Sequence, residues 1–212
     1  MYKADIPELM QLIQEGRAGA DYAWEHRDEL VAREHVYTLY GPHEPPLGAS
    51  HPSSMISAKA RQLRKTTRRK SYTAYELDSS YKPLRTVYVI DQKIDCVDHH
   101  FELNGVTYVY SFGKYGRKQY SDRIYVLKYQ NGKPIYLAET TENYIFAEFY
   151  DYIGPDRMGI SCYGFATEAK YTMLGYPVDW NAPIGAKNSP VGCHYREEPV
   201  QYIDFSHWFE EK

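Results

Sequence analysis

Four side chains with useful chemistry alternate along one segment of the chain, at Cys96, Asp98, His100 and Glu102. Side chains of a β-strand point alternately to its two faces, so a strand over residues 94–103 places all four on one face. Carboxylates beside an imidazole can hold a metal ion or move protons, which makes Asp98, His100 and Glu102 candidate catalytic residues. The alternative is the ordinary solvated face of an antiparallel sheet.

A second candidate site consists of Asp78 followed by Asp91, Gln92 and Lys93. This order resembles the PD-(D/E)xK pattern of metal-dependent nucleases. The resemblance implies that Asp78 and Asp91 hold Mg²⁺ and that Lys93 stabilises the attacking water. The alternative is that aspartate stands at a strand end because it favours turns.

Thiols and imidazoles provide a third set, which comprises Cys96, His100, Cys193 and His194. Structural zinc sites usually contain closely spaced ligand pairs, and the chain has no Cys-x2-Cys pair. Buried thiols and surface histidines are the alternative, and we expect neither a metal nor another cofactor. Three widely separated cysteines also favour a reducing compartment over a disulfide framework.

Positive charge is concentrated in residues 55–70, which contain seven basic side chains and no acidic one: Lys59, Arg61, Arg64, Lys65, Arg68, Arg69 and Lys70. The net charge of the whole chain is −3, so the remainder carries −10. We expect a short helix here that can contact nucleic-acid phosphates over residues 59–70. The alternative is a helix packed against the acidic remainder of its own chain or of a second copy.

Tyrosine is unusually frequent, with 23 residues among 212. Its ring is apolar and its hydroxyl polar, so it suits both sheets and protein interfaces. We predict a surface that binds another protein, with the candidate contact residues Tyr108, Tyr110, Tyr125, Tyr129, Tyr136 and Tyr144. The alternative is that sheets simply favour tyrosine.

The predicted fold is α+β, in which N-terminal helices pack on an antiparallel meander of five to seven strands and a loop-rich segment follows. Strands are expected at 72–77, 84–90, 94–103, 106–112, 124–130, 135–139 and 144–152, with further strands possible near 159–165 and 198–203. Helices are expected at 5–16, ending at Gly16, and at 20–39. Residues 1–54 then form a helical hairpin with a proline-rich linker, and residues 55–212 form the basic helix and the sheet.

Two Asn-Gly pairs predict tight hairpin turns, because a type I′ turn needs positive φ at both central residues. The turn at Asn104-Gly105 pairs Leu103 with Val106. It places His99, Phe101, Tyr108 and Tyr110 on a buried face and leaves Asp98 and His100 on a polar one. The turn at Asn131-Gly132 pairs Leu127 with Tyr136, and Pro134 indicates a sheet edge close by.

Several function classes lack their signatures, since the chain has no phosphate-binding loop, dinucleotide fingerprint, nucleophile elbow or His-Glu-x-x-His helix. No apolar run is long enough for a membrane span or a signal peptide, which favours a cytoplasmic location. We therefore expect a non-catalytic protein-binding protein, of the immunity or antitoxin kind found in bacteria. A homo-oligomer is a further form that such binding can take. The alternatives are a metal-dependent phosphodiesterase or nuclease, and a nucleic-acid-binding protein that uses residues 59–70.

Overall fold

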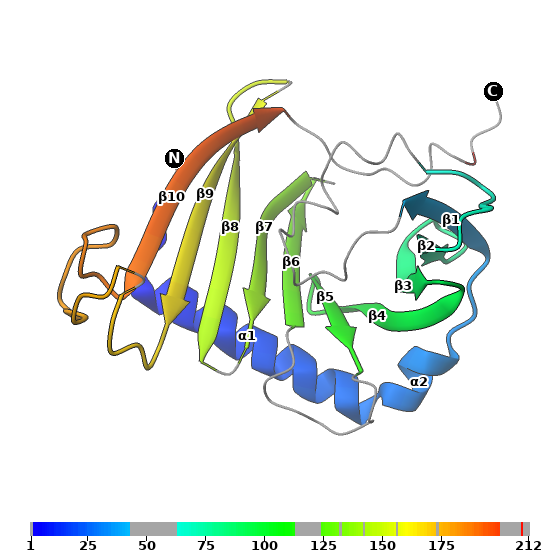
Figure 1. Cartoon of the computed structure of the whole chain (residues 1–212), viewed down its shortest axis with the longest axis horizontal. Coiled ribbons are helices and arrows are strands. Elements are labelled where there is room, and N and C mark those ends of the chain that lie inside the picture. The colour runs from blue at the N-terminus through cyan, green and yellow to red at the C-terminus, as the bar shows by residue number, and fades with distance from the viewer. Residues whose placement is uncertain are drawn as a thin grey trace. The chain divides into compact units, whose positions relative to one another are not determined.

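The computed structural model describes residues 2–42, 63–112, 124–131, 133–141, 143–155, 157–172, 174–199 and 209 (Figure 1). Helices α1 (Ile6–Glu25) and α2 (Arg27–Ala32) precede ten strands within this part of the chain. The strands are β1 (Tyr37–Pro42), β2 (Tyr72–Leu77), β3 (Pro83–Ile90), β4 (Lys93–Leu103), β5 (Val106–Ser111), β6 (Ile124–Gln130), β7 (Lys133–Thr140), β8 (Tyr144–Tyr152), β9 (Arg157–Ala166) and β10 (Val191–Pro199). Helices on an antiparallel sheet agree with the predicted class, but the predicted five to seven strands are too few.

The chain divides into two compact units. The β6–β10 unit consists of Met1–Ala20 and Arg123–Val200, and the β1–β5 unit consists of Asp21–Asp122 and Gln201–Lys212. Within each unit, consecutive strands pair antiparallel in chain order. The predicted boundary at residue 54 lies outside the described residues.

In the β6–β10 unit, the first turns of α1 pack on one face of the strands (Figure 1). Leu9, Leu12 and Ile13 recur at helical spacing and are buried. Gly16 lies directly against Thr140, so closely that a β-carbon at this position would collide with the threonine Oγ1. The Tyr136 hydroxyl also donates a hydrogen bond of 3.0 Å to a carboxylate oxygen of Glu15.

In the β1–β5 unit, aromatic side chains connect the helical segments to the strands. The indole Nε1 of Trp24 donates to the Tyr110 hydroxyl at 2.8 Å, and the Tyr22 ring stacks on Phe101. A second cluster, around β1 and β2, contains Leu39, Leu63, Tyr75 and Leu77, with Tyr37, Tyr81 and Phe209 packed against it.

The helix predictions need three corrections. Helix α1 continues through Gly16 to Glu25, because the missing side chain allows the close contact with Thr140. The predicted helix 20–39 ends at Ala32, and strand β1 was missed. No helix in the described part of the chain has the length and apolar character needed to cross a bilayer.

The two Asn-Gly turns have different outcomes. Asn104 and Gly105 have φ angles of 53° and 75°, and Leu103 pairs with Val106 as predicted. In the second hairpin Leu127 pairs with Leu137 rather than Tyr136, because the register shifts between Lys128 and Tyr129. This bulge accommodates Pro134, which has no N–H to donate. Strand β7 pairs with β8 only from Tyr136 onward, so within the described strands its end at Pro134 has a strand partner on the β6 side alone, as the predicted local edge requires.

The predicted basic helix is wrong for the residues that are described. Residues 63–70 contain no helix. Leu63 is buried, and the backbone of Arg64 exchanges two hydrogen bonds of 2.8 Å with Tyr40 of β1. Residues 55–62, which include Lys59 and Arg61, lie outside the described residues.

Candidate functional site

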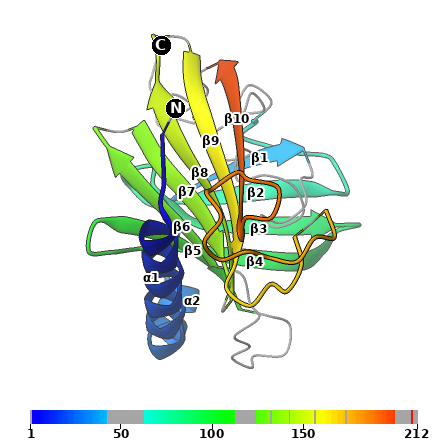
Figure 2. The same cartoon turned by 90° about the vertical axis from the view of Figure 1, so that its left-hand side faces the viewer.

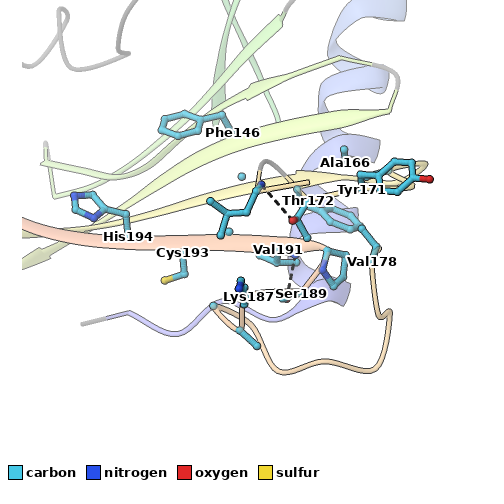
Figure 3. Close-up of a pocket in the computed structure, with 18 of the residues that line it drawn as sticks. Phe146, Ala166, Tyr171, Thr172, Val178, Lys187, Ser189, Val191, Cys193 and His194 are labelled. Atoms are coloured by element: carbon cyan, nitrogen blue, oxygen red, sulfur yellow. Dashed lines mark hydrogen bonds between the residues drawn. The ribbon is translucent and has the colours of Figure 1, made fainter. Parts of the chain in front are cut away.

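A cavity of about 580 Å³ lies where the β9–β10 loop, residues 167–190, meets the ends of β8, β9 and β10. All of its lining residues belong to the β6–β10 unit. Figure 2 shows the loop, coloured gold to orange, beside β10, and Figure 3 shows the side chains that line the cavity. The volume falls in the range of ordinary ligand-binding pockets, roughly 300–1,000 Å³.

The cavity exists because two of the three residues paired side by side across β8, β9 and β10 are glycines. Phe146 of β8 pairs with Gly164 of β9, which pairs with Gly192 of β10, so three adjacent strands carry only one side chain there. A β-carbon at Gly164 would meet only the Tyr144 hydroxyl, at 3.9 Å, and one at Gly192 would meet only the Gly164 carbonyl oxygen, also at 3.9 Å. The two glycines therefore leave open space above the sheet.

The β9–β10 loop is held by its own hydrogen bonds. The Thr172 hydroxyl accepts from the backbone N–H groups of Leu174 and Tyr176, both at 3.3 Å. Asp179 donates its N–H to the Asn188 carbonyl at 2.9 Å. Such turns fix the positions of the side chains that the loop presents.

Large apolar side chains of this loop remain exposed. The exposed fraction is 65% for Tyr171, 68% for Leu174, 42% for Tyr176 and 47% for Trp180. Tyr171 and Leu174 also line the cavity, and the ammonium of Lys187 lies 3.8 Å from the centre of the Tyr176 ring. We call Tyr171, Leu174, Tyr176 and Trp180 together the aromatic rim. Because Tyr171 and Leu174 line the cavity and Tyr176 contacts the lining residue Lys187, this surface differs from singly scattered exposed residues.

Next to the cavity lies a buried polar network centred on Glu148, which is fully buried. One Glu148 oxygen accepts from Arg196 at 2.7 Å and the other from the Tyr150 hydroxyl at 2.9 Å. Arg196 also donates to Glu198 at 2.7 Å and to the sulfur of Cys162 at 3.0 Å. The carboxylate charge is thus compensated inside the unit.

The pKa shifts of Cys162 and Arg196 keep the thiol protonated and the guanidinium charged. Burial and the nearby Glu148 charge raise the pKa of the Cys162 thiol to about 12. Burial alone would lower the pKa of Arg196, but its hydrogen bond and charge attraction to Glu148 outweigh that effect and raise it. Because Cys162 stays a thiol, the network does not supply an activated nucleophile.

Comparison with protein-family models, with curated proteins and with solved structures finds no significant match.

The predicted nuclease residues do not come together. Asp78 caps the turn before β3, where its carboxylate accepts from the N–H groups of Ser80 and Lys82. Asp91 lies in the turn after β3, with a φ angle of 48°, and Lys93 begins β4. The eight residues of β3 separate the two aspartates by roughly 25 Å, too far for a shared metal ion. Both aspartates serve turns, which was the alternative considered from the sequence.

The polar face of β4 is less exposed than predicted. Asp98 and His100 are buried, whereas Glu102 is exposed and pairs with Lys82 at 3.0 Å. His100 Nε2 lies 2.8 Å from the Thr86 hydroxyl. Among the described residues, neither the other ring nitrogen of His100 nor the Oδ2 of Asp98 has a hydrogen-bond partner. The expectation of one solvated face is thus wrong at these two positions.

Burial dominates the ionisation of this β4 face. It raises the pKa of Asp98 to about 6, although hydrogen bonds from Tyr88, Cys96 and Ser111 oppose the shift. It lowers the pKa of His100 to about 3, with Arg33 adding to the effect. The Cys96 thiol has its pKa raised to about 11, again mainly by burial, so it is not a ready metal ligand.

The four proposed metal ligands fall into two groups. Cys96 and His100 belong to the β1–β5 unit, and Cys193 and His194 to the β6–β10 unit. Within the described ranges, no three histidine, cysteine or acidic side chains are placed to hold one metal ion. Cys193 and His194 instead line the cavity.

The predicted contact tyrosines separate by burial. Tyr108, Tyr110 and Tyr125 are buried and are therefore not available as contact residues. Tyr136 is half-buried, whereas Tyr129 and Tyr144 are exposed to 44% and 39%. Tyr144 also lines the cavity, so it alone connects the predicted set with the candidate site.

Sequence reasoning missed the aromatic rim, because residues 153–203 were interpreted as loop and given no function. The available signal was four large apolar residues within ten positions of a segment rich in glycine and proline. A polar loop would not carry them without a structural or binding role.

Proposed function

We propose that this chain is a protein-binding protein whose contact surface is the aromatic rim with its cavity. The observation that carries the proposal is the exposure of Tyr171 and Leu174 at a mostly apolar cavity, with Tyr176 and Trp180 exposed on the same loop. Aromatic side chains with an adjoining pocket are typical of the energetic centre of protein interfaces. An immunity or antitoxin role is one form of this function and remains a prediction.

Two features favour a protein partner over a small molecule. Tyr176 and Trp180 extend the apolar surface beyond the lining of the cavity, where a ligand enclosed in the cavity would not reach them. The loop is also fixed by hydrogen bonds, so binding would cost little ordering entropy. The charges of the loop nearly balance, with Glu168 and Asp179 against Lys170 and Lys187. Recognition here would therefore depend on apolar contact rather than on the acidic surface expected from the sequence.

The test is recovery of a partner by the whole chain from lysate of its own host. The first variant combines Tyr171→Ser, Leu174→Ser and Trp180→Ser, and the second fills the cavity with Gly164→Leu, where the backbone has room for a side chain. The matched control is Ile94→Ser, because Ile94 is as exposed as Leu174, at 68%, but belongs to the other unit. We expect one polypeptide to be enriched by the wild type and the control and lost from both variants. Enrichment of the same polypeptide by all four proteins would contradict the proposal.

A second candidate function, binding of nucleic acid, is favoured by the exposure of Arg64, Lys65, Arg68, Arg69 and Lys70. Their charges would contact phosphates, and affinity would fall steeply with salt. Fluorescence anisotropy with a labelled 20-nucleotide single strand tests this candidate. Binding that is unchanged when Arg68, Arg69 and Lys70 become glutamate would exclude it.

A further inference from the structure

Strand β10 has one edge without a strand partner among the described residues. On its other edge it pairs with β9 in an unbroken register, from Val191 opposite Phe165 to Pro199 opposite Arg157. It is the last strand in the sheet order. An unpaired edge presents backbone donors and acceptors that another strand can use.

The backbone groups on this edge can be identified from Val191. Its carbonyl accepts from Gly185 and its N–H donates to the Ser189 hydroxyl, both at 3.2 Å, so the Val191 groups point away from β9. In an antiparallel strand the direction of these groups alternates from residue to residue. Cys193, Tyr195 and Glu197 therefore direct their N–H and C=O groups to the same open edge, in a strand without a bulge.

The strand at the start of the other unit provides a contrast. The edge of β1 is covered, because Tyr40 exchanges two backbone hydrogen bonds with Arg64. The β9–β10 loop covers β10 only at Val191. Among the described residues, the chain thus covers the β1 edge at its centre, at Tyr40, and leaves three residues of β10 available.

We propose that β10 accepts an extended segment of a partner protein as an additional strand, beside the cavity. This inference rests on the proposed function and specifies the partner as a polypeptide in β conformation. The partner strand would bond to the backbone of Cys193, Tyr195 and Glu197, as in other cases of strand addition.

The surroundings of the edge fit such a segment. Gly192, Cys193 and His194 line the cavity, so the open edge is continuous with the aromatic rim. Gly192 has no side chain, so a large apolar side chain of the added strand opposite it has room to enter the cavity. At the other end of the strand, Glu197 pairs with Arg157 and Glu198 with Arg196, so these charges are compensated within the unit and recognition depends on the open backbone edge and the cavity.

The test begins with selection of peptides from a random phage-displayed library on the whole wild-type chain. The selected peptide is then synthesised and titrated against two variants at one position. Tyr195→Pro removes an outward N–H that β9 does not use, whereas Tyr195→Ala removes the side chain and keeps that N–H. We expect Tyr195→Pro to weaken binding by about tenfold, and Tyr195→Ala to weaken it by less than about threefold.

Hydrogen exchange of the complex supplies a second readout. Bound peptide should slow exchange of the amides of Cys193, Tyr195 and Glu197, whereas the amides of His194 and Arg196 already bond to β9. Circular dichroism checks that Tyr195→Pro folds, and Cys193→Pro replaces it if it does not.

The outcomes separate this inference from the proposed function. If Tyr195→Pro and Cys193→Pro bind like the wild type, or if the three outward amides stay unprotected, strand addition is wrong. In that case, loss of peptide binding in the Gly164→Leu variant would still support the cavity as part of the contact surface. Recovery of no peptide would also overturn strand addition to a partner. If sedimentation shows a dimer that only Tyr195→Pro dissociates, the edge belongs to a second copy, which also overturns the inference.

Discussion

The two units bury ionisable side chains in opposite ways. In the β6–β10 unit, Glu148 is fully buried but accepts hydrogen bonds from Arg196 and Tyr150. In the β1–β5 unit, Asp98 and His100 are also buried, yet each keeps an atom that has no hydrogen-bond partner among the described residues. The first arrangement compensates the charge with a partner, whereas in the second burial shifts both pKa values toward the neutral forms, which keeps His100 uncharged at pH 7 and makes the charge of Asp98 costly. Burial alone therefore does not identify a site, because the partners decide what a buried group can do.

The two units also differ in how their exposed apolar side chains are distributed. The β6–β10 unit carries three exposed aromatic rings, Tyr171, Tyr176 and Trp180, on one loop beside a cavity. In the β1–β5 unit, exposed apolar side chains such as Val31, Val36 and Ile94 come from separate elements. For this reason the proposed contact surface lies in the β6–β10 unit, although most of the polar motifs seen in the sequence lie in the other.

The largest effect is expected when the compensated charge is broken. Arg196→Met leaves Glu148 buried without its cation, and we expect the free energy of unfolding to fall by about 3–5 kcal/mol. Urea denaturation at pH 7 measures the change. The double variant with Glu148→Leu should recover most of the stability, since it removes the buried charge as well. A double variant as unstable as the single one would show that packing, not charge compensation, is what Arg196 contributes.

A smaller effect is expected at His100, and it depends on pH. Its folded pKa of about 3 lies below the unfolded value, so its contribution is complete above pH 6.5 and is lost as the pH falls. At pH 5 the unfolded state gains about 2 kcal/mol from protonation of this one histidine. His100→Gln should reduce the difference in unfolding free energy between pH 7 and pH 5 by that amount. An unchanged difference would mean that His100 is accessible to protons in the folded state.

Asp98 should affect the pH dependence of the free energy of unfolding in the opposite direction to His100. Its folded pKa of about 6 lies above the unfolded value of 3.8, so its ionisation destabilises the fold as the pH rises through 6. Acidification from pH 7 to pH 5 therefore gains about 1 kcal/mol at this residue. In Asp98→Asn this gain is absent, and the loss of stability on acidification should become larger. If it becomes smaller, the carboxyl is ionised in the fold and has a partner.

The smallest effect on stability is expected from the aromatic rim. Its side chains are exposed, so the triple variant at Tyr171, Leu174 and Trp180 should keep the free energy of unfolding within about 0.5 kcal/mol of the wild type. Thermal unfolding measures this directly. A loss of more than about 2 kcal/mol would indicate that the rim supports the fold, and the binding experiment would then need the cavity-filling variant alone.

Local chemistry made much of the sheet predictable. The Asn104-Gly105 turn fixed the pairing of Leu103 with Val106, because few residues accept positive φ at two successive positions. The second Asn-Gly pair alone did not predict the bulge. The bulge is associated with Pro134, which lies beyond the turn and has no N–H to donate to β6. Strand β1 was missed because the alternation in Tyr37–Pro42 is short and ends in proline.

Helix α1 shows that helix propensity alone does not predict where a helix ends. Gly16 favours an end to the helix when only its neighbours in sequence are considered. The contact with Thr140, which is far away in sequence, makes the missing side chain useful and lets the helix continue to Glu25. The candidate nuclease residues failed for a related reason, because spacing along the chain did not reveal that β3 holds Asp78 and Asp91 at opposite ends.

The sequence by itself determined the antiparallel, tyrosine-rich sheet, most strand positions and the first hairpin register, because alternation and turn residues act over a few positions. Only the tertiary structure decided which tyrosines are buried, which carboxylates have partners and which residues surround the cavity. Those properties depend on side chains brought together from distant segments. Two glycines on neighbouring strands and a loop folded over them make a cavity that no stretch of the sequence contains.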